Sequence, residues 1–171
     1  MGDTAIKLMR ATANLSAPKK IEAIEKLKKN QSILMSYISD YSIEQDFEIS
    51  KHPIKSKDII TAKQPIVEDY SPIQLNNSNV LSNLNLRQKN ELGCFVDSAL
   101  EMSNDTGWVF DVLGASNLGF TDNGKRLVLV DTIPSRVNRI NDPSVRYLEA
   151  LASEINPVIF STLKLNVHLE K

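Results

Sequence analysis

Three polar side chains near the middle of the chain are of the types that act on phosphate groups. Asp111, Asn117 and Asp131 lie within one stretch of sequence, residues 110–131. Two short apolar runs in this stretch flank an Asn-Gly pair, which is the strongest local signal of a β-hairpin. The hairpin would hold two carboxylates and an amide at its ends. Carboxylate and amide oxygens on a rigid support are what the transfer of a phosphoryl group to a hydroxyl with Mg²⁺ requires.

Each of these residues also has a purely structural interpretation. Asp131 at the end of a strand is suited to cap a turn, and Asn117 beside Gly119 is suited to form one. Asp111 is equally of the type that bonds to backbone amides within a loop. The residues alone leave both interpretations open.

The composition is that of an ordinary globular protein. The 171 residues are 42% hydrophobic and 24% charged, which suffices for one domain with a packed core. The formal net charge of −1 gives no overall attraction to nucleic acid or to an anionic membrane, so we expect neither as a partner. The single cysteine, Cys94, cannot form an intrachain disulfide. We therefore expect a cytoplasmic protein in which Cys94 is a small buried side chain.

Hydrophobic spacing and turn residues predict an α+β chain. We expect a flexible N-terminus over residues 1–16 and a single domain over residues 17–171. The expected helices cover residues 18–38, residues 86–102 with a left-handed stop at Gly107, and a segment that begins after Asp142. The expected strands or extended segments are 47–49, 58–62, 64–70, 118–120 and 127–130, with a loop over 71–85 and a β-leaning tail over 158–169.

The order of these elements resembles the catalytic segment of the protein-kinase-like superfamily. The matching residues are Asn117-Leu118-Gly119-Phe120, the Asp122-Asn123-Gly124 turn and Leu127-Val128-Leu129-Val130-Asp131. In that superfamily, a long helix leads to a loop that carries an Asp and then an Asn, and the following hairpin ends in a metal-binding Asp. The run from Gly114 to Gly119 is most similar to the divergent kinase-like proteins of bacteria and their phages.

The resemblance implies a reduced protein-kinase-like fold, with mostly C-lobe-type helices around the catalytic-loop hairpin. Residues 17–70 would be a remnant of the N-lobe, and residues 71–171 would be a partial C-lobe. The implied cofactors are Mg²⁺ and ATP.

The resemblance also implies a role for particular residues. Asn117 and Asp131 would be the metal ligands, and Asp111 would be the catalytic base that orients the acceptor hydroxyl. Glu68 and Tyr70 would offer backbone groups to the adenine.

The chain departs from the family pattern in several places. Asp111 precedes Asn117 by six residues, one more than is usual. Asp131 is followed by Thr132-Ile133 rather than Phe-Gly, and residues 1–85 contain one glycine, Gly2. That segment cannot supply a glycine-rich phosphate loop, and no strand-borne lysine is evident ahead of the first helix.

Three functional hypotheses follow. The first is a phosphotransferase or nucleotide-binding protein that uses Mg²⁺ and ATP. The second is a catalytically inactive kinase-like module for interaction or regulation, such as a bacterial or phage effector. The third is a small helical adaptor in which the hairpin is incidental. The partner is a nucleotide in the first case and another protein in the other two.

Overall fold

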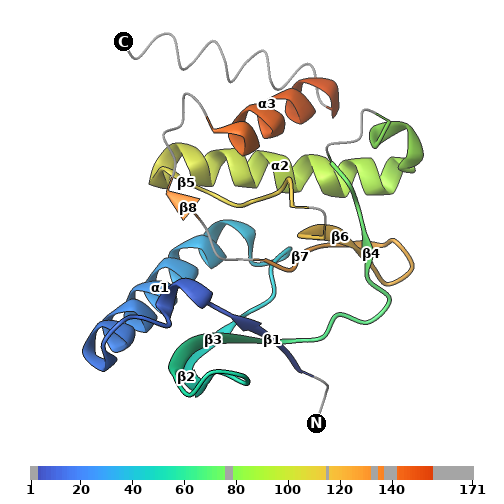
Figure 1. The fold of residues 1–171 in the computed structure, drawn as a ribbon. Coiled ribbons are helices and arrows are strands. Elements are labelled where there is room, and N and C mark those ends of the chain that lie inside the picture. The colour runs from blue at the N-terminus through green and yellow to red at the C-terminus, as the bar shows by residue number, and fades with distance from the viewer. Residues whose placement is uncertain (1–3, 76–78, 115, 132–134, 137–141, 156–171) are drawn as a thin grey trace, which may run out of the picture.

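The protein has an α+β fold, as predicted, in a computed structural model that describes residues 4–75, 79–114, 116–131, 135–136 and 142–155 (Figure 1). The helices are α1 (Ala17–Ile38), α2 (Leu86–Thr106) and α3 (Pro143–Ile155), with short 3-10 turns at Arg10–Thr12 and Leu81–Asn83. The strands are β1 (Thr4–Leu8), β2 (Asp46–Lys51), β3 (Asp58–Pro65), β4 (Ser71–Pro72), β5 (Trp108–Val109), β6 (Leu118–Thr121), β7 (Arg126–Leu129) and β8 (Ser135–Arg136).

The first sheet is antiparallel and has β3 between β1 and β2. β3 carries the run Ile59-Ile60-Thr61, in which every side chain is buried, because branched side chains pack well on a pleated surface. β1 pairs with β3 along its whole length, from Thr4 opposite Pro65 to Leu8 opposite Thr61. We expected residues 1–16 to be flexible, but this segment contributes an edge strand to the first sheet.

Helix α1 lies between β1 and β2 in the sequence and runs from beside the first sheet toward α2 (Figure 1). It begins after Ser16, has Pro18 in its first turn, and continues without a break to Ile38, in agreement with the predicted helix over residues 18–38. Only its C-terminal half reaches the main core. Leu34 and Ile38 are buried there, whereas Ile21 near the other end is 55% exposed.

The main core lies between α2, α3 and the hairpin formed by β6 and β7. At the start of α2, the Asn85 side chain accepts from the Gln88 backbone, and the Gln88 side chain accepts from the Asn85 backbone, which satisfies two unpaired donors at the helix end. Gly107 ends the helix with a φ of 68°, the left-handed stop that was predicted. The largest side chains of the core include Leu92, Phe95, Met102, Leu118, Leu127 and Leu148.

The hairpin has the turn that its sequence predicts. Leu118 pairs with Leu129 and Thr121 pairs with Arg126. Between the strands, Asp122, Asn123 and Gly124 all have positive φ angles of 53°, 56° and 82°, a conformation that these residue types tolerate best. β4 pairs with the other edge of β6, so β6 is the central strand of a second, three-stranded sheet.

Some local expectations are corrected. Cys94 is exposed because the buried side of α2 runs through Leu92, Phe95, Val96 and Ala99. The segment 64–70 is not one extended piece, since β3 ends at Pro65 and the next strand starts at Ser71. The predicted β-leaning tail over 158–169 lies outside the described residues. Among the described residues, no helix is long and apolar enough to cross a membrane.

Candidate functional site

The loop between β5 and β6 folds back on itself and brings Asp111 and Asn117 together. The Asn117 side-chain amide donates to the Asp111 carbonyl oxygen at 2.6 Å, and its backbone N–H donates to the Gly114 carbonyl at 3.1 Å. The exposed Asp111 carboxylate accepts from the Gly114 backbone at 3.0 Å. Asp111 thus has the backbone contact of its structural interpretation, and its carbonyl rather than its carboxylate contacts Asn117.

The hairpin places Asn117 next to Asp131. The Val130 N–H donates to the Asn117 carbonyl at 2.8 Å, which extends the pairing of β6 with β7 by one step beyond Leu118 and Leu129. Asn117 therefore lies opposite Val130, the residue before Asp131, while the Asn117 side chain contacts the Asp111 carbonyl and the Asp131 side chain contacts Lys7.

Lys7 is a site residue that the sequence reasoning missed. It lies on β1 opposite Ala62 of β3, and its Nζ forms an ion pair with Asp131 Oδ2. The two residues are 124 positions apart in the chain, and Asp131 lies just beyond β7, which is in a different sheet from β1. The side chain of Lys7 is 50% exposed and that of Asp131 is 25% exposed, so both remain within reach of a ligand. The only sequence signal was a short alternating run, Thr4-Ala5-Ile6-Lys7-Leu8, ahead of the first helix.

The segment between α1 and β2 fixes the first sheet against the hairpin. The Leu129 N–H donates to the Tyr41 carbonyl at 2.6 Å. Gln45, which is 3% exposed, donates from its side chain to Gln64 Oε1 at 2.7 Å and to the Val130 carbonyl at 3.3 Å. These contacts hold the backbone immediately before Asp131 against the sheet that carries Lys7.

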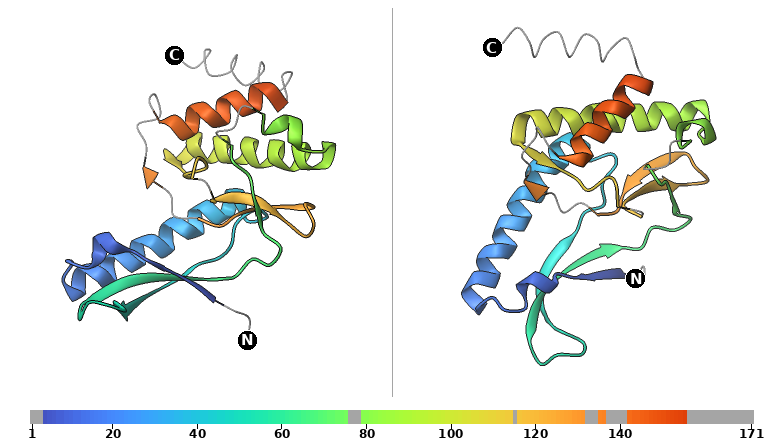
Figure 2. Two further views of the ribbon diagram at one scale, coloured as in Figure 1. Left: turned by 45° about the vertical axis from the view of Figure 1, so that its right-hand side comes forward. Right: turned by 45° about the horizontal axis from the view of Figure 1, so that its top comes forward.

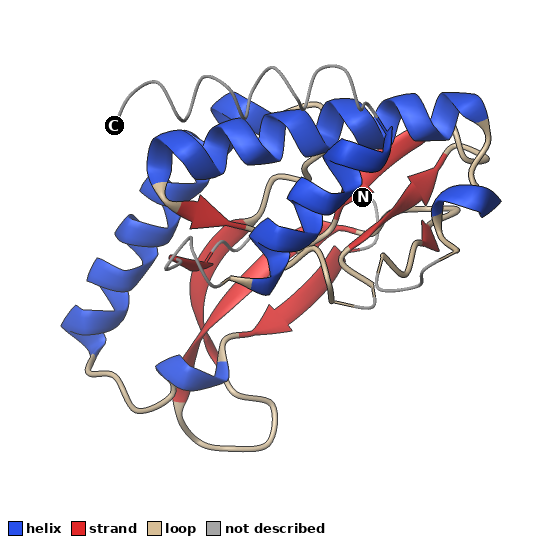
Figure 3. Cartoon of the chain, turned by 90° about the horizontal axis from the view of Figure 1, so that it is seen from above, coloured by secondary structure: helices blue, strands red, loops and turns tan. Residues whose placement is uncertain are grey.

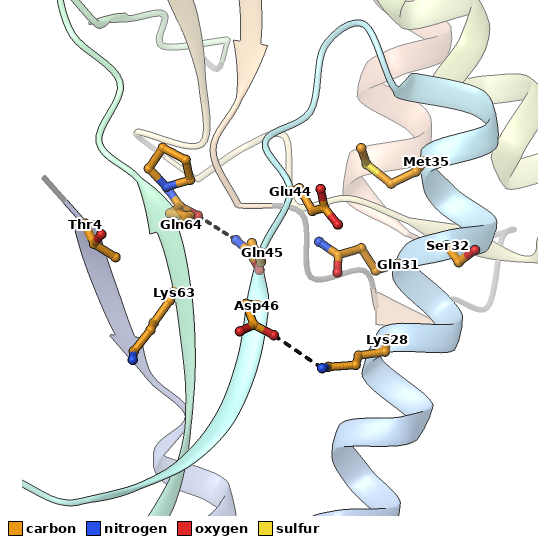
Figure 4. Close-up of a pocket in the computed structure, with 11 residues that line it drawn as sticks. Thr4, Lys28, Gln31, Ser32, Met35, Glu44, Gln45, Asp46, Lys63 and Gln64 are labelled. Atoms are coloured by element: carbon orange, nitrogen blue, oxygen red, sulfur yellow. Dashed lines mark hydrogen bonds and ion pairs between the residues drawn. The ribbon is translucent and has the colours of Figure 1, made fainter. Parts of the chain in front are cut away.

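A cavity of about 890 Å³ opens beside this contact, between α1 and the ends of β2 and β3 (Figure 4). Its charged lining residues are Lys28, Glu44, Asp46 and Lys63, and Lys28 pairs with Asp46 at 3.3 Å. Gln45 and Gln64 also line it, whereas Lys7 and Asp131 do not. The cavity therefore adjoins the Lys7–Asp131 pair through Gln45 but is not centred on it.

The residues proposed to hold adenine instead make contacts within the chain. Thr121 Oγ1 donates to the Glu68 carbonyl at 2.7 Å, so that carbonyl is already engaged by the hairpin. The Tyr70 hydroxyl donates to the Ser116 carbonyl at 2.8 Å, and burial of the ring raises the pKa of Tyr70 to about 12. The first contact joins the segment after β3 to the end of β6, and the second joins it to the loop that carries Asn117.

The donor set suits a cation that a ligand helps to bind. Mg²⁺ is usually held by one or two carboxylates together with phosphate oxygens and water. Asp131 would supply one carboxylate, and Asn117 would supply an amide oxygen. Within the part of the chain that the structure describes, no three His, Cys, Asp or Glu side chains converge to hold a metal by themselves. A metal at this place would therefore require the ligand's own oxygens.

Comparison of the chain with protein-family models, with curated proteins and with solved structures gives no match.

Proposed function

We propose that the chain binds a nucleoside triphosphate together with Mg²⁺ where the first sheet meets the hairpin, in a kinase-like arrangement. The observation that carries this proposal is the ion pair between Lys7 and Asp131, which joins a strand lysine to a hairpin-end carboxylate across the two sheets. An exposed ion pair contributes little to stability. Its two charges are of the kinds that bind phosphate and metal.

Three features of the chain support the kinase-like part of the proposal. The β1 run Thr4-Ala5-Ile6-Lys7 is similar to the Val-Ala-Ile-Lys motif, in which kinases carry the lysine that contacts the nucleotide phosphates. A long helix, α1, follows this strand, as it does in kinases. The hairpin then packs against α2 through β7, so Asn117 and Asp131 lie on a rigid support.

Each residue has a defined task in this proposal. Lys7 would leave Asp131 and contact the phosphates, since both are exposed enough to separate. Asp131 and the oxygen of the Asn117 side chain would face the metal, while the Asn117 amide nitrogen keeps its bond to the Asp111 carbonyl. Bound Mg²⁺ would neutralise charge on the phosphates. Asp111 would hold the acceptor hydroxyl once its carboxylate leaves the Gly114 backbone.

A catalytically inactive kinase-like module remains the second candidate, and one observation favours it. Kinases hold the strand lysine with a glutamate of the following helix. The α1 residues that line the cavity are Lys28, Gln31, Ser32 and Met35, none of which is acidic. The Gln31 amide instead bonds to the backbone of Gln45, at 2.9 and 2.7 Å. Such a chain would bind a nucleotide or a protein without catalysing phosphoryl transfer.

Thermal unfolding with and without Mg·ATP tests the proposal. A ligand at about 100 times its Kd adds about 2.7 kcal/mol to the free energy of unfolding, which is about 5–10 °C in Tm for a chain of this size. We expect this shift in the wild type and its loss in Lys7→Met and in Asp131→Asn. Lys63→Met is the matched control, because Lys63 lies on the same sheet but pairs with Glu48 at 2.7 Å. A wild type that shows no shift, or a shift that survives both site substitutions, contradicts the proposal.

A second measurement separates the two candidates. An active enzyme releases or transfers the γ-phosphate, and Asp111→Asn should abolish this turnover while the Mg·ATP shift persists. An inactive module shows the shift without turnover, and its Asp111→Asn variant behaves like the wild type.

A further inference from the structure

The loop that joins β2 to β3, residues 52–57, projects from the body of the protein at the end of the first sheet (Figures 2 and 3). Gln45 lies just before β2, and this loop follows the other end of that strand. Ile54 in the loop is 89% exposed, the highest value among the large hydrophobic side chains that the structure describes. Exposure of this apolar side chain to water is unfavourable in free energy, and burial would remove that cost.

The loop is held in shape by its own hydrogen bonds. The Nδ1 atom of His52 accepts from the backbone N–H of Ile54 and of Lys55, both at 3.1 Å. The His52 backbone donates to the Lys57 carbonyl at 2.9 Å, which closes the base of the loop. Ile54 is therefore presented outward by a preformed turn, and little conformational entropy remains to be lost on binding.

Basic residues flank Ile54 in the sequence, and the Nζ of one of them, Lys57, donates to Asn14 Oδ1 at 3.2 Å. Lys51, Lys55 and Lys57 lie in or beside the loop, and Arg10 lies against it in a shared apolar hollow of about 300 Å³. The one acidic residue in the segment 51–58 is Asp58, which pairs with Lys51 at 2.7 Å. The net charge of −1 for the whole chain therefore conceals a basic end.

We propose that this loop docks the protein on an anionic phospholipid surface, with Ile54 entering the interfacial region and the flanking cations contacting the headgroups. An exposed apolar side chain flanked in sequence by lysines fits a bilayer, because the apolar interior of a bilayer lies directly beneath its anionic headgroups. A loop of six residues offers far less than the ~800 Å² per partner of a stable protein interface. This inference is independent of the proposed nucleotide site, and it revises the expectation from net charge that no membrane is a partner.

The interaction is reversible and depends on salt. Each basic residue near an anionic surface raises the affinity about fivefold. Insertion of Ile54 adds about tenfold, if roughly half of its transfer free energy is gained. The electrostatic contribution to the affinity falls at about 1 M salt, because the Debye length shrinks from ~10 Å at ~0.1 M salt to ~3 Å.

Vesicle sedimentation of the full chain tests the proposal. We expect binding to vesicles with about 30% phosphatidylserine and none to pure phosphatidylcholine. Ile54→Asn should weaken binding about tenfold and Lys55→Gln about fivefold. The matched controls are Leu86→Asn, at a side chain that is 76% exposed on α2, and Lys26→Gln on the exposed side of α1. Absence of wild-type binding overturns the proposal, as does equal loss in the loop variants and their controls.

A fluorescent variant provides a second readout. Ile54→Trp changes a side chain with almost no packing contacts, so the fold should be unaffected. We expect the fluorescence of the introduced tryptophan to shift to shorter wavelength on phosphatidylserine vesicles. On phosphatidylcholine vesicles, its emission wavelength should not change. Sedimentation without that shift would place the membrane contact elsewhere on the chain and overturn the assignment of this loop.

Discussion

Gly119 is the residue whose substitution tests the packing of the second sheet most directly. It lies buried in β6, between Pro72 of β4 and Val128 of β7. A Cβ atom at this position would lie 2.5 Å from the Ser71 carbonyl oxygen and 2.7 Å from two ring atoms of Tyr70. Real Cβ atoms do not approach other heavy atoms so closely, so Gly119→Ala must displace one neighbour or the other.

Neither neighbour can move without cost. The Ser71 oxygen belongs to the backbone of β4, and Ser71 is paired opposite Phe120. The Tyr70 ring is held by the bond from its hydroxyl to the Ser116 carbonyl. Overpacking of a well-filled site costs about 1–3 kcal/mol, and a backbone obstacle favours the upper end of that range. We expect Gly119→Ala to lower the free energy of unfolding by about 2–3 kcal/mol, or Tm by about 5–10 °C.

Thermal and urea unfolding measure this loss, and Gly107→Ala is the matched control. Gly107 has a φ of 68° with no atom within 4 Å of an added Cβ, so alanine there meets backbone strain alone, worth about 1 kcal/mol. A Gly119→Ala variant as stable as Gly107→Ala would refute the reasoning. It would mean that β4 yields freely and does not fix the loop that carries Asn117.

Three further outcomes follow from single contacts. Asn85→Ala removes the reciprocal cap of α2 and should cost about 1 kcal/mol in urea unfolding; no loss would show that solvent satisfies this helix end equally well. Because the pKa of Tyr70 is raised from 10.0 to about 12, the folded state should lose stability as the pH rises through that window, and a pH series of unfolding curves should show a smaller fall in Tyr70→Phe. Lys7→Met should change the stability of the ligand-free protein by less than about 1 kcal/mol, since its pair with Asp131 is partly exposed; a larger loss would make the pair a structural contact.

Elements that depend on nearby residues were predictable from the sequence. The extent of α1 follows from Pro18 in its first turn and from the spacing of apolar residues, and the end of α2 follows from Gly107. The hairpin turn follows from its Asn-Gly pair, because only a few residue types adopt positive φ at low cost. In each case, the cause and the structure lie within one or two turns of the same segment.

Elements that depend on distant partners were not predictable in this way. β1 is five residues long and owes its existence to pairing with β3, which comes after the whole of α1. Five residues of alternating pattern do not distinguish a strand from a frayed end. Cys94 was misplaced for a different reason, because the buried face of α2 was predicted correctly through Leu92, Phe95 and Val96. At 3.6 residues per turn, Cys94 lies about 200° around the helix from Leu92, so the helical period itself places it on the outer side.

The same distinction explains how the candidate site was only partly foreseen. Asp111, Asn117 and Asp131 were grouped because one loop and one hairpin carry them, and the bonds from Asn117 to Asp111 and from Val130 to Asn117 are local consequences of that loop. Lys7 reaches Asp131 only after three nonlocal steps: the pairing of β1 with β3, the bond from Gln45 to the Val130 carbonyl, and the bond from Leu129 to the Tyr41 carbonyl. A carboxylate at a strand end is common. A carboxylate that pairs with a lysine from a strand of another sheet requires all three of these nonlocal contacts to form. That convergence is why the ion pair, rather than the hairpin sequence, is the stronger ground for a phosphate-binding site.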